Sequence, residues 1–105
     1  MPTSKPSLYL RVKERYPEFV AAVESLGEAA RSLGPLEEKT LQLVQLAAAA
    51  AVRSEGATHS HVRRALKAGA SADEIRHTLL ALTSTIGFPN VTAALSWAED
   101  ILAEE

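Results

Sequence analysis

The sequence predicts an all-α protein, folded as a compact bundle of about five to six helices. Three observations carry this prediction: apolar residues recur at helical spacing, proline and glycine separate the segments, and no segment alternates as a strand would. A length of 105 residues suits a single domain over residues 1–105. The hydrophobic fraction of 47% is enough to fill one core.

The first third of the chain is expected to hold two helices. Residues 1–5 are polar and should fray, and a short helix follows over residues 6–15. The second helix begins at Pro17, and its apolar stripe recurs at nearly helical spacing. That stripe consists of Phe19, Val20, Val23, Leu26, Ala30 and Leu33. Gly34 suits a left-handed C-terminal position, and Pro35 prevents simple continuation of the helix.

The next predicted helix covers about residues 36–53 and is expected at the centre of the fold. Glu37 and Glu38 lie in its first turn, where the helix dipole favours acidic side chains. After Gln45 the segment is nearly apolar on every side, which is typical of a buried helix. The alanine run 47–51 has little bulk, so neighbouring backbones can approach closely.

Two further helices are expected after the central one. The first covers about residues 57–68 and ends at Gly69, which suits a C-terminal cap. Ser71 with Glu74 three residues later forms a capping-box pattern. This pattern predicts the start of a helix that reaches about Ile86.

The chain is expected to break again at residues 87–89, because the residue before Pro89 favours an extended conformation. Asn90 can then cap a last helix. The apolar stripe of that helix is Val91, Ala94, Leu95, Ala98, Ile101 and Leu102.

Charge and composition exclude several functions. The formal net charge of -2 gives no basic surface for nucleic acid. No apolar run reaches the ~20 residues of a membrane span, and the start of the chain lacks the apolar centre of a signal peptide. Cysteine is absent, which excludes disulfides, cysteine nucleophiles and thiolate-bound zinc. We therefore expect a cytoplasmic protein with no nucleic-acid partner and no membrane association.

His61 is the leading candidate for chemistry. It lies near the start of its helix, in line with Thr58, Ala65 and Ala68 on a mostly apolar stripe. An imidazole held there can donate or accept a proton near neutral pH. A partly buried histidine bonded to a backbone carbonyl is the alternative, and the sequence leaves both open.

Gln42 is the second candidate. It lies with Gln45 on one side of an otherwise apolar helix, and a buried amide there needs hydrogen-bonding partners. It could hold a carboxylate or carbonyl group of a ligand beside His61, bridge two helices, or face water.

The histidines do not have the spacing of a metal site. His59 and His61 are two residues apart, which places them on different faces of one helix, and His77 lies in a separate polar stretch. None of them forms the i, i+4 histidine pair of a helical zinc site. We expect no metal and no cofactor.

Three segments carry a resemblance to a known family. The string EKTLQLV over residues 38–44, followed by the alanine run, resembles the "KTRELI-LA" helix of the carboxymuconolactone decarboxylase family. The string HVRRALKAGASADEI over 61–75 resembles that family's "H-V--AL-AGAS-EEI" segment, and residues 87–89 match its "G-P" turn. The resemblance covers about residues 34–103 and implies an alkylhydroperoxidase D-like helical fold.

The resemblance also decides which chemistry is compatible with the chain. Alkylhydroperoxidase D-like members use a Cys-x-x-Cys pair, a histidine and an earlier glutamate. By position these would fall at Ser54, Ala57, His61 and Gln42, and only the histidine is retained. The chain therefore resembles a cysteine-less member of the family, without thiol peroxidase chemistry.

The decarboxylase branch of the family also lacks the cysteine pair and keeps the histidine. The resemblance implies a substrate that is a small unsaturated carboxylic acid or lactone. We assign proton transfer to His61, hydrogen-bond donation to Gln42, and substrate binding to Thr58 and Arg64.

The alternative is a non-catalytic small-ligand-binding or structural protein that has lost the family's redox site. A histidine phosphotransfer bundle fits less well, because His61 lies on the apolar stripe. The resemblance also implies that the protein forms a homo-oligomer, either a trimer or a hexamer.

Overall fold

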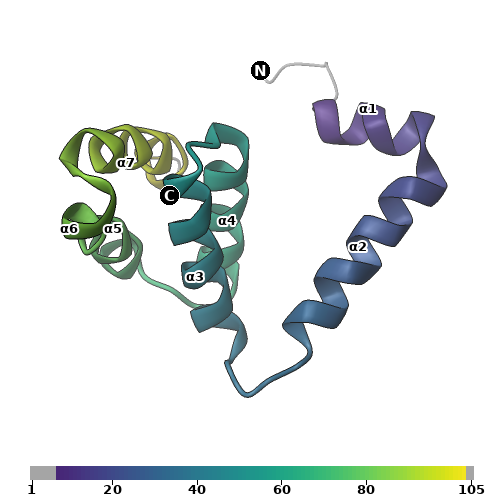
Figure 1. The fold of residues 1–105 in the computed structure, drawn as a ribbon, viewed down its shortest axis with the longest axis horizontal. Helices are drawn as coiled ribbons and strands as arrows, with labels where there is room; N and C mark the ends of the chain where they lie inside the picture. Colours follow the sequence, from purple (N-terminus) through teal and green to yellow (C-terminus); the bar gives the residue numbers. More distant parts are fainter. Residues whose placement is uncertain (1–6, 104–105) are drawn as a thin grey trace. The chain divides into compact units, whose positions relative to one another are not determined.

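The computed structural model describes residues 7–103, so the fraying expected for residues 1–5 lies outside the described part. This part contains seven α-helices and no strand, which confirms the predicted all-α class (Figure 1). The helices are α1 (Leu8–Arg15), α2 (Pro17–Arg31), α3 (Glu38–Ala51), α4 (Glu55–Lys67), α5 (Ala72–Leu80), α6 (Thr83–Ile86) and α7 (Phe88–Leu102). The chain divides into two compact units, Met1–Pro35 and Leu36–Glu105.

The first unit is a pair of helices. The Ser7 side chain caps α1 by accepting a hydrogen bond from the Leu10 amide at 3.2 Å. The hydroxyl of Tyr9 donates to Glu24 of α2, and Lys13 Nζ lies 3.4 Å from the same carboxylate. These contacts join α1 and α2 through exposed polar side chains. As predicted, Gly34 adopts a left-handed conformation, with φ of 65°.

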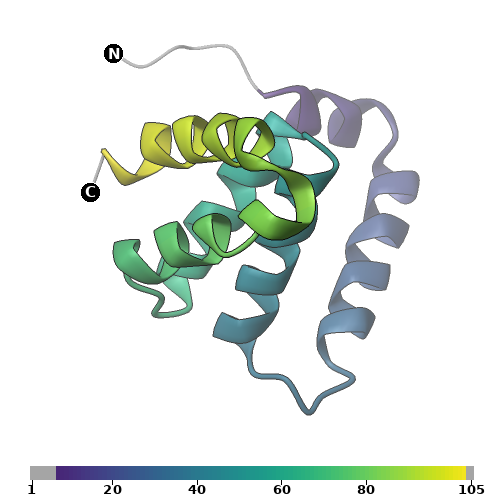
Figure 2. The same cartoon turned by 60° about the vertical axis from the view of Figure 1, so that its left-hand side comes forward.

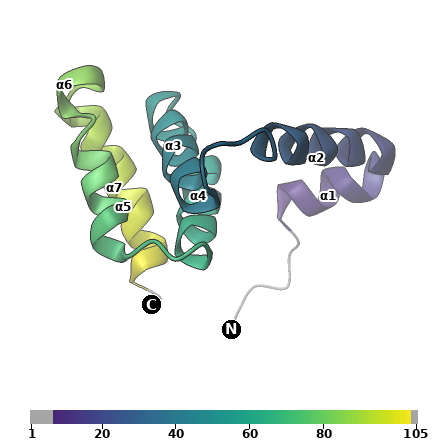
Figure 3. The ribbon, with the colours of Figure 1, turned by 90° about the horizontal axis from the view of Figure 1, so that it is seen from below.

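The second unit contains the core. In it, α3 packs against α4, α5 and α7, and α7 also packs against α4, α5 and α6. Figures 2 and 3 show α5 alongside α7 and α3 alongside α4. The buried core residues between these helices are Leu46, Ala50, Val62, Ala65, Ala70, Ile75, Leu79, Ala94, Ala98, Ile101 and Leu102. Five of them are alanines, whose small side chains let the helices approach closely.

The helix predicted to be buried all round, now α3, is buried on one side only. Gln42, Leu46, Ala49 and Ala50 are its buried residues. Val44, in contrast, is 52% exposed within the chain. The apolar composition correctly indicated that this helix packs in the core. Among the described residues, however, only one of its faces is buried.

Local capping decides where α4 and α5 begin. The side chain of Ser54 accepts a hydrogen bond from the amide of Ala57 at 3.2 Å, so α4 starts two residues earlier than predicted. The predicted capping box is present: the Glu74 amide donates to Ser71 Oγ at 3.0 Å, and the Ser71 amide donates to Glu74 Oε1 at 2.9 Å. Gly69 ends the preceding helical segment with φ of 103°.

Two boundaries near the end of the chain differ from the sequence prediction. The helix expected to reach Ile86 stops at Leu80, and α6 forms a separate short helix after it. The last helix begins at Phe88 rather than after Asn90, because Pro89 has no N–H and fits a first helical turn. Asn90 therefore does not cap α7; its Nδ2 donates to the Ile86 carbonyl at 2.7 Å.

Among the described residues, no helix has both the length and the apolar character that crossing a bilayer would require.

Candidate functional site

The two leading candidates, Gln42 and His61, meet between α3 and α4. Gln42 Oε1 lies 2.9 Å from His61 Nδ1. On its other side, Gln42 Nε2 donates to Glu38 Oε2 at 2.7 Å. The three side chains form a continuous hydrogen-bonded chain from a carboxylate, through an amide, to an imidazole.

The chain has one consistent set of donors and acceptors. An ionised carboxylate can only accept, so the amide nitrogen of Gln42 must face Glu38 and its oxygen must face His61. The oxygen then accepts a hydrogen from Nδ1 of His61. A neutral ring in this arrangement carries its hydrogen on Nδ1 and none on Nε2.

The helical geometry explains why these residues meet. Glu38 and Gln42 are four residues apart on α3 and therefore lie on the same side of the helix. Gln42 is only 1% exposed, so its amide is desolvated and depends on its two partners. His61 is half-buried.

A pocket of about 220 Å³ lies next to these hydrogen-bonded side chains and is lined by Glu38, Arg64, Lys67 and Ala68. Glu38 belongs to both the pocket and the hydrogen-bonded chain. Arg64 follows His61 by three residues and therefore lies on the same side of α4. Two cations and one carboxylate leave the pocket with a net positive charge, which suits a small anion.

Thr58 is placed differently from the other predicted site residues. It is fully buried, and its hydroxyl donates to the backbone carbonyl of Ser54 at 2.8 Å. A threonine in a helix commonly makes such a bond, which occupies its only donor. Thr58 therefore offers no hydroxyl hydrogen to the pocket in this structure.

Sequence reasoning missed two residues of this site, Glu38 and Lys67. The signal for Glu38 was its i, i+4 spacing to Gln42, although a first-turn acid is explained equally well by the helix dipole. Lys67 follows Arg64 by three residues, as expected for two cations on one helix face. Nothing in the sequence alone distinguishes that arrangement from a solvated surface.

Two carboxyl groups with lowered pKa values, those of Glu74 and Glu99, pair with side chains of other helices. Neither belongs to the hydrogen-bonded chain of Glu38, Gln42 and His61. The pKa of Glu74 is lowered by the hydrogen bond from the Ser71 backbone and by Lys39 of α3. The pKa of Glu99 is lowered by its hydrogen bond from Arg76, whose Nε donates at 2.7 Å. These pairs connect α3 with α5 and α5 with α7, and so support the packing that positions the site.

The comparisons with known proteins agree with this fold. The family model of the carboxymuconolactone decarboxylase family matches residues 17–100. The chain belongs to this family. The predicted family and its helical fold are thereby confirmed, and the match begins at the start of α2, earlier than the resemblance in the sequence had indicated.

Two proteins are similar to this chain over most of their length. An uncharacterized protein of Methanocaldococcus jannaschii is 28% identical over 94 residues, which cover 90% of this chain and 88% of that protein. The crystal structure of an apo carboxymuconolactone decarboxylase family protein from Legionella pneumophila has a TM-score of 0.78 and 26% sequence identity. That match covers 90% of this chain and 84% of the Legionella chain. The likeness therefore extends over nearly the whole of each protein.

Proposed function

We propose that this family member is a cofactor-independent, decarboxylase-like lyase that acts on a small unsaturated carboxylic acid or lactone. The observation that supports this most is the hydrogen-bonded chain Glu38–Gln42–His61 beside a positively charged pocket. A histidine with a fixed tautomer next to a pocket for an anion has the elements of an acid that protonates a carboxylic acid substrate.

The reaction needs one bond broken and one proton delivered. The bond between a substrate carbon and its carboxylate breaks, carbon dioxide leaves, and the electron pair stays on the unsaturated carbonyl system. The protonated ring of His61 delivers its Nε2 proton to carbon and returns to the neutral form with hydrogen on Nδ1. Water then supplies the next proton. The net reaction consumes one proton for each carbon dioxide released.

The other residues have separate roles in this proposal. Arg64 and Lys67 attract the substrate carboxylate and offset the charge of Glu38 in the same pocket. Gln42 was expected to donate a hydrogen bond to the substrate, but both ends of its amide contact neighbouring side chains. We therefore assign it a positioning role, in which it orients the ring of His61.

Thiol peroxidase chemistry has no support in this chain. By the resemblance, Ser54 and Ala57 fall where peroxidase members carry the reactive cysteines, and the sequence contains no cysteine elsewhere. The side chain of Ser54 caps α4. A hydroxyl group in that role cannot replace a thiolate or form a disulfide.

The test is carbon dioxide release from a panel of unsaturated lactone acids and short unsaturated acids. His61→Gln should lower kcat by at least ~100-fold, since general acid catalysis contributes about that much or more. His77→Gln is the matched control, because His77 is an exposed histidine on another helix, and its turnover should stay unchanged. Near-normal turnover of His61→Gln would overturn the assignment.

A ligand screen distinguishes the proposal from a non-catalytic relative. A panel member at ~100 times its Kd should stabilise the fold by about 2.7 kcal/mol and raise Tm. Binding without carbon dioxide release, undiminished in His61→Gln, would favour the small-ligand-binding alternative. Arg64→Ala should weaken binding of carboxylates and leave neutral lactones unaffected.

We also propose that the chain assembles with itself, as a trimer or hexamer. The support is a row of exposed apolar side chains on α2, where Phe19 is 64%, Val23 49% and Leu26 71% exposed. These residues are spaced by four and three positions and so follow one face of the helix. Exposed apolar rows of this kind are typical of interfaces. Light scattering should give a multiple of 11.2 kDa, and Leu26→Glu should reduce it. A monomeric wild type would contradict this proposal. The cytoplasmic location remains a prediction.

A further inference from the structure

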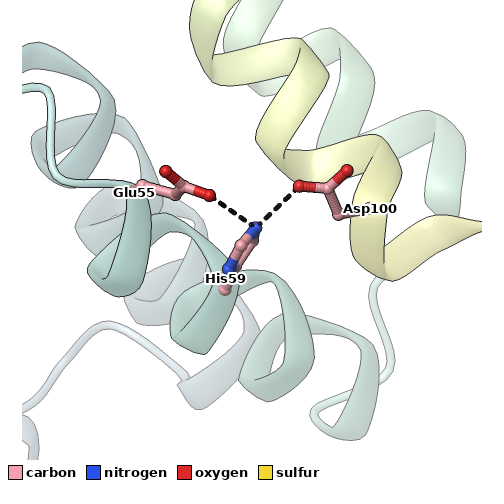
Figure 4. A group of neighbouring side chains, drawn as sticks. All are labelled: Glu55, His59 and Asp100. Carbon is pink, nitrogen blue, oxygen red and sulfur yellow. Dashed lines mark hydrogen bonds and ion pairs between the residues drawn. The ribbon is translucent and has the colours of Figure 1, made fainter. Parts of the chain in front are cut away.

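A second histidine, His59, lies between two carboxylates that come from different helices. Its Nε2 is 3.0 Å from Asp100 Oδ2 of α7 and 4.0 Å from Glu55 Oε2 of α4 (Figure 4). One atom from each residue lies within 4.8 Å of the other two. We propose that Glu55, His59 and Asp100 form a binding site for a divalent transition-metal ion, of which Zn²⁺ is the most suitable probe.

The geometry requires little rearrangement to bind such an ion. Zinc takes nitrogen and oxygen ligands at about 2.0–2.2 Å in a tetrahedral arrangement, which places neighbouring ligand atoms roughly 3.4 Å apart. The observed separations of 3.0 and 4.0 Å lie on either side of that value. Both carboxylate side chains are 57% exposed, so they can rotate toward an ion while the helices hold their backbones in place.

The arrangement is not explained by one hydrogen bond alone. The N–H at Nε2 of His59 accounts for the contact with Asp100, but 4.0 Å is too long for a hydrogen bond to Glu55. With a neutral ring the three groups carry two negative charges at close range, which a divalent cation would neutralise. One imidazole and two carboxylates are a donor set used for zinc and other first-row metals, and water can complete the coordination.

The proposed metal site is separate from the site around His61. His59 and His61 are two residues apart on α4 and lie on different faces of that helix. The metal would join α4 to α7, two helices that already pack together in the second unit. Its expected effect is therefore stabilisation of that helix pair, independent of turnover at the pocket.

The experiment is a titration of the chelator-treated protein with Zn²⁺, in competition with a chromophoric chelator. Co²⁺ absorption serves as a second readout of the ligand set. The wild type should bind one equivalent, and Zn²⁺ should raise its Tm, because an ion that binds only the folded state stabilises it. His59→Gln and Asp100→Asn should each weaken binding at least ~10-fold, since second-shell changes alone often cost that much.

Glu55→Gln is the decisive variant. Glu55 makes no hydrogen bond to His59, although the two form an ion pair at 4.0 Å when the ring is charged, so a purely structural cluster predicts a change in Tm at most and no change in Zn²⁺ affinity. The metal site predicts at least ~10-fold weaker Zn²⁺ binding, whatever the Tm of the metal-free variant. His77→Gln, a change at an exposed histidine, controls for adventitious binding and should bind as the wild type does. Unchanged affinity in Glu55→Gln, equal loss in His77→Gln, or no saturable binding by the wild type would overturn the proposal.

Discussion

The substitution Gln42→Leu tests the central chain of the candidate site. Leucine has nearly the volume of glutamine, so the change removes both side-chain hydrogen bonds without opening a large cavity. The bond to Glu38 is charge-assisted and contributes about 1.5–3 kcal/mol, and the bond to His61 about 0.5–1.5 kcal/mol. Burying an apolar side chain at a position that is 1% exposed returns part of this loss.

The expected net destabilisation is therefore about 2 kcal/mol, a central value within the range of those contributions. For a domain of this size it corresponds to a fall in Tm of roughly 10 °C. Urea unfolding with linear extrapolation measures the free energy, and the slope m should not change. Glu38→Gln is the matched variant, because it removes only the charge from the same contact and should cost less.

The tautomer of His61 provides a second, independent readout. The wild-type neutral ring should carry its hydrogen on Nδ1, since Gln42 Oε1 faces that nitrogen. In Gln42→Leu this constraint is lost, and the ring should shift toward the form protonated on Nε2. Nitrogen-15 NMR of the imidazole distinguishes the two forms. A variant as stable as the wild type, with an unchanged tautomer, would refute the argument.

Three further predictions concern stability. Ser71→Ala removes the capping box and should lower the free energy of unfolding by about 1 kcal/mol in urea, whereas a change within error would contradict its role. The lowered pKa of Glu99 beside Arg76 means that the unfolded state binds the proton more tightly. The contribution of this pair is therefore present above the ordinary glutamate value of 4.5 and is lost as pH falls through the lower, folded value. Between neutral and acidic pH, the free energy of unfolding should fall less steeply for Glu99→Gln than for the wild type. Identical slopes against pH would show that this pair is not linked to proton binding. Gln45 Oε1 is buried and has no hydrogen-bond partner in the described chain, so Gln45→Met should be neutral or stabilise by up to about 1 kcal/mol. A clear loss of Tm would show that Gln45 has a partner in solution.

The local signals in the sequence were reliable where a few adjacent residues decide the structure. The Ser71–Glu74 capping box and the left-handed positions of Gly34 and Gly69 depend on neighbours within one turn, and they were found as predicted. The start of α7 was misjudged although its signals are local, because Pro89 can either end a helix or occupy a first turn.

The candidate site was predicted in part. His61 and Gln42 were both identified as polar residues on apolar helices, and the direct contact between them depends on how α3 packs against α4. Glu38 joins them through an i, i+4 contact that many surface acids also have. Thr58 was expected to bind substrate in the pocket. Its hydroxyl donates instead to the Ser54 carbonyl, and this bond depends on the side-chain rotamer in the folded helix.

The sequence by itself indicated the helical class and the family, and its lack of cysteine excludes thiol chemistry. The catalytic role of His61 stays a prediction. Tertiary structure alone decided which polar groups meet: Gln42 with His61, and Asp100 with His59 across 41 positions of the chain. The physical reason is that helix period and capping are properties of adjacent residues. Contacts between helices depend instead on how their apolar faces pack, and that packing sets which polar side chains lie close to one another.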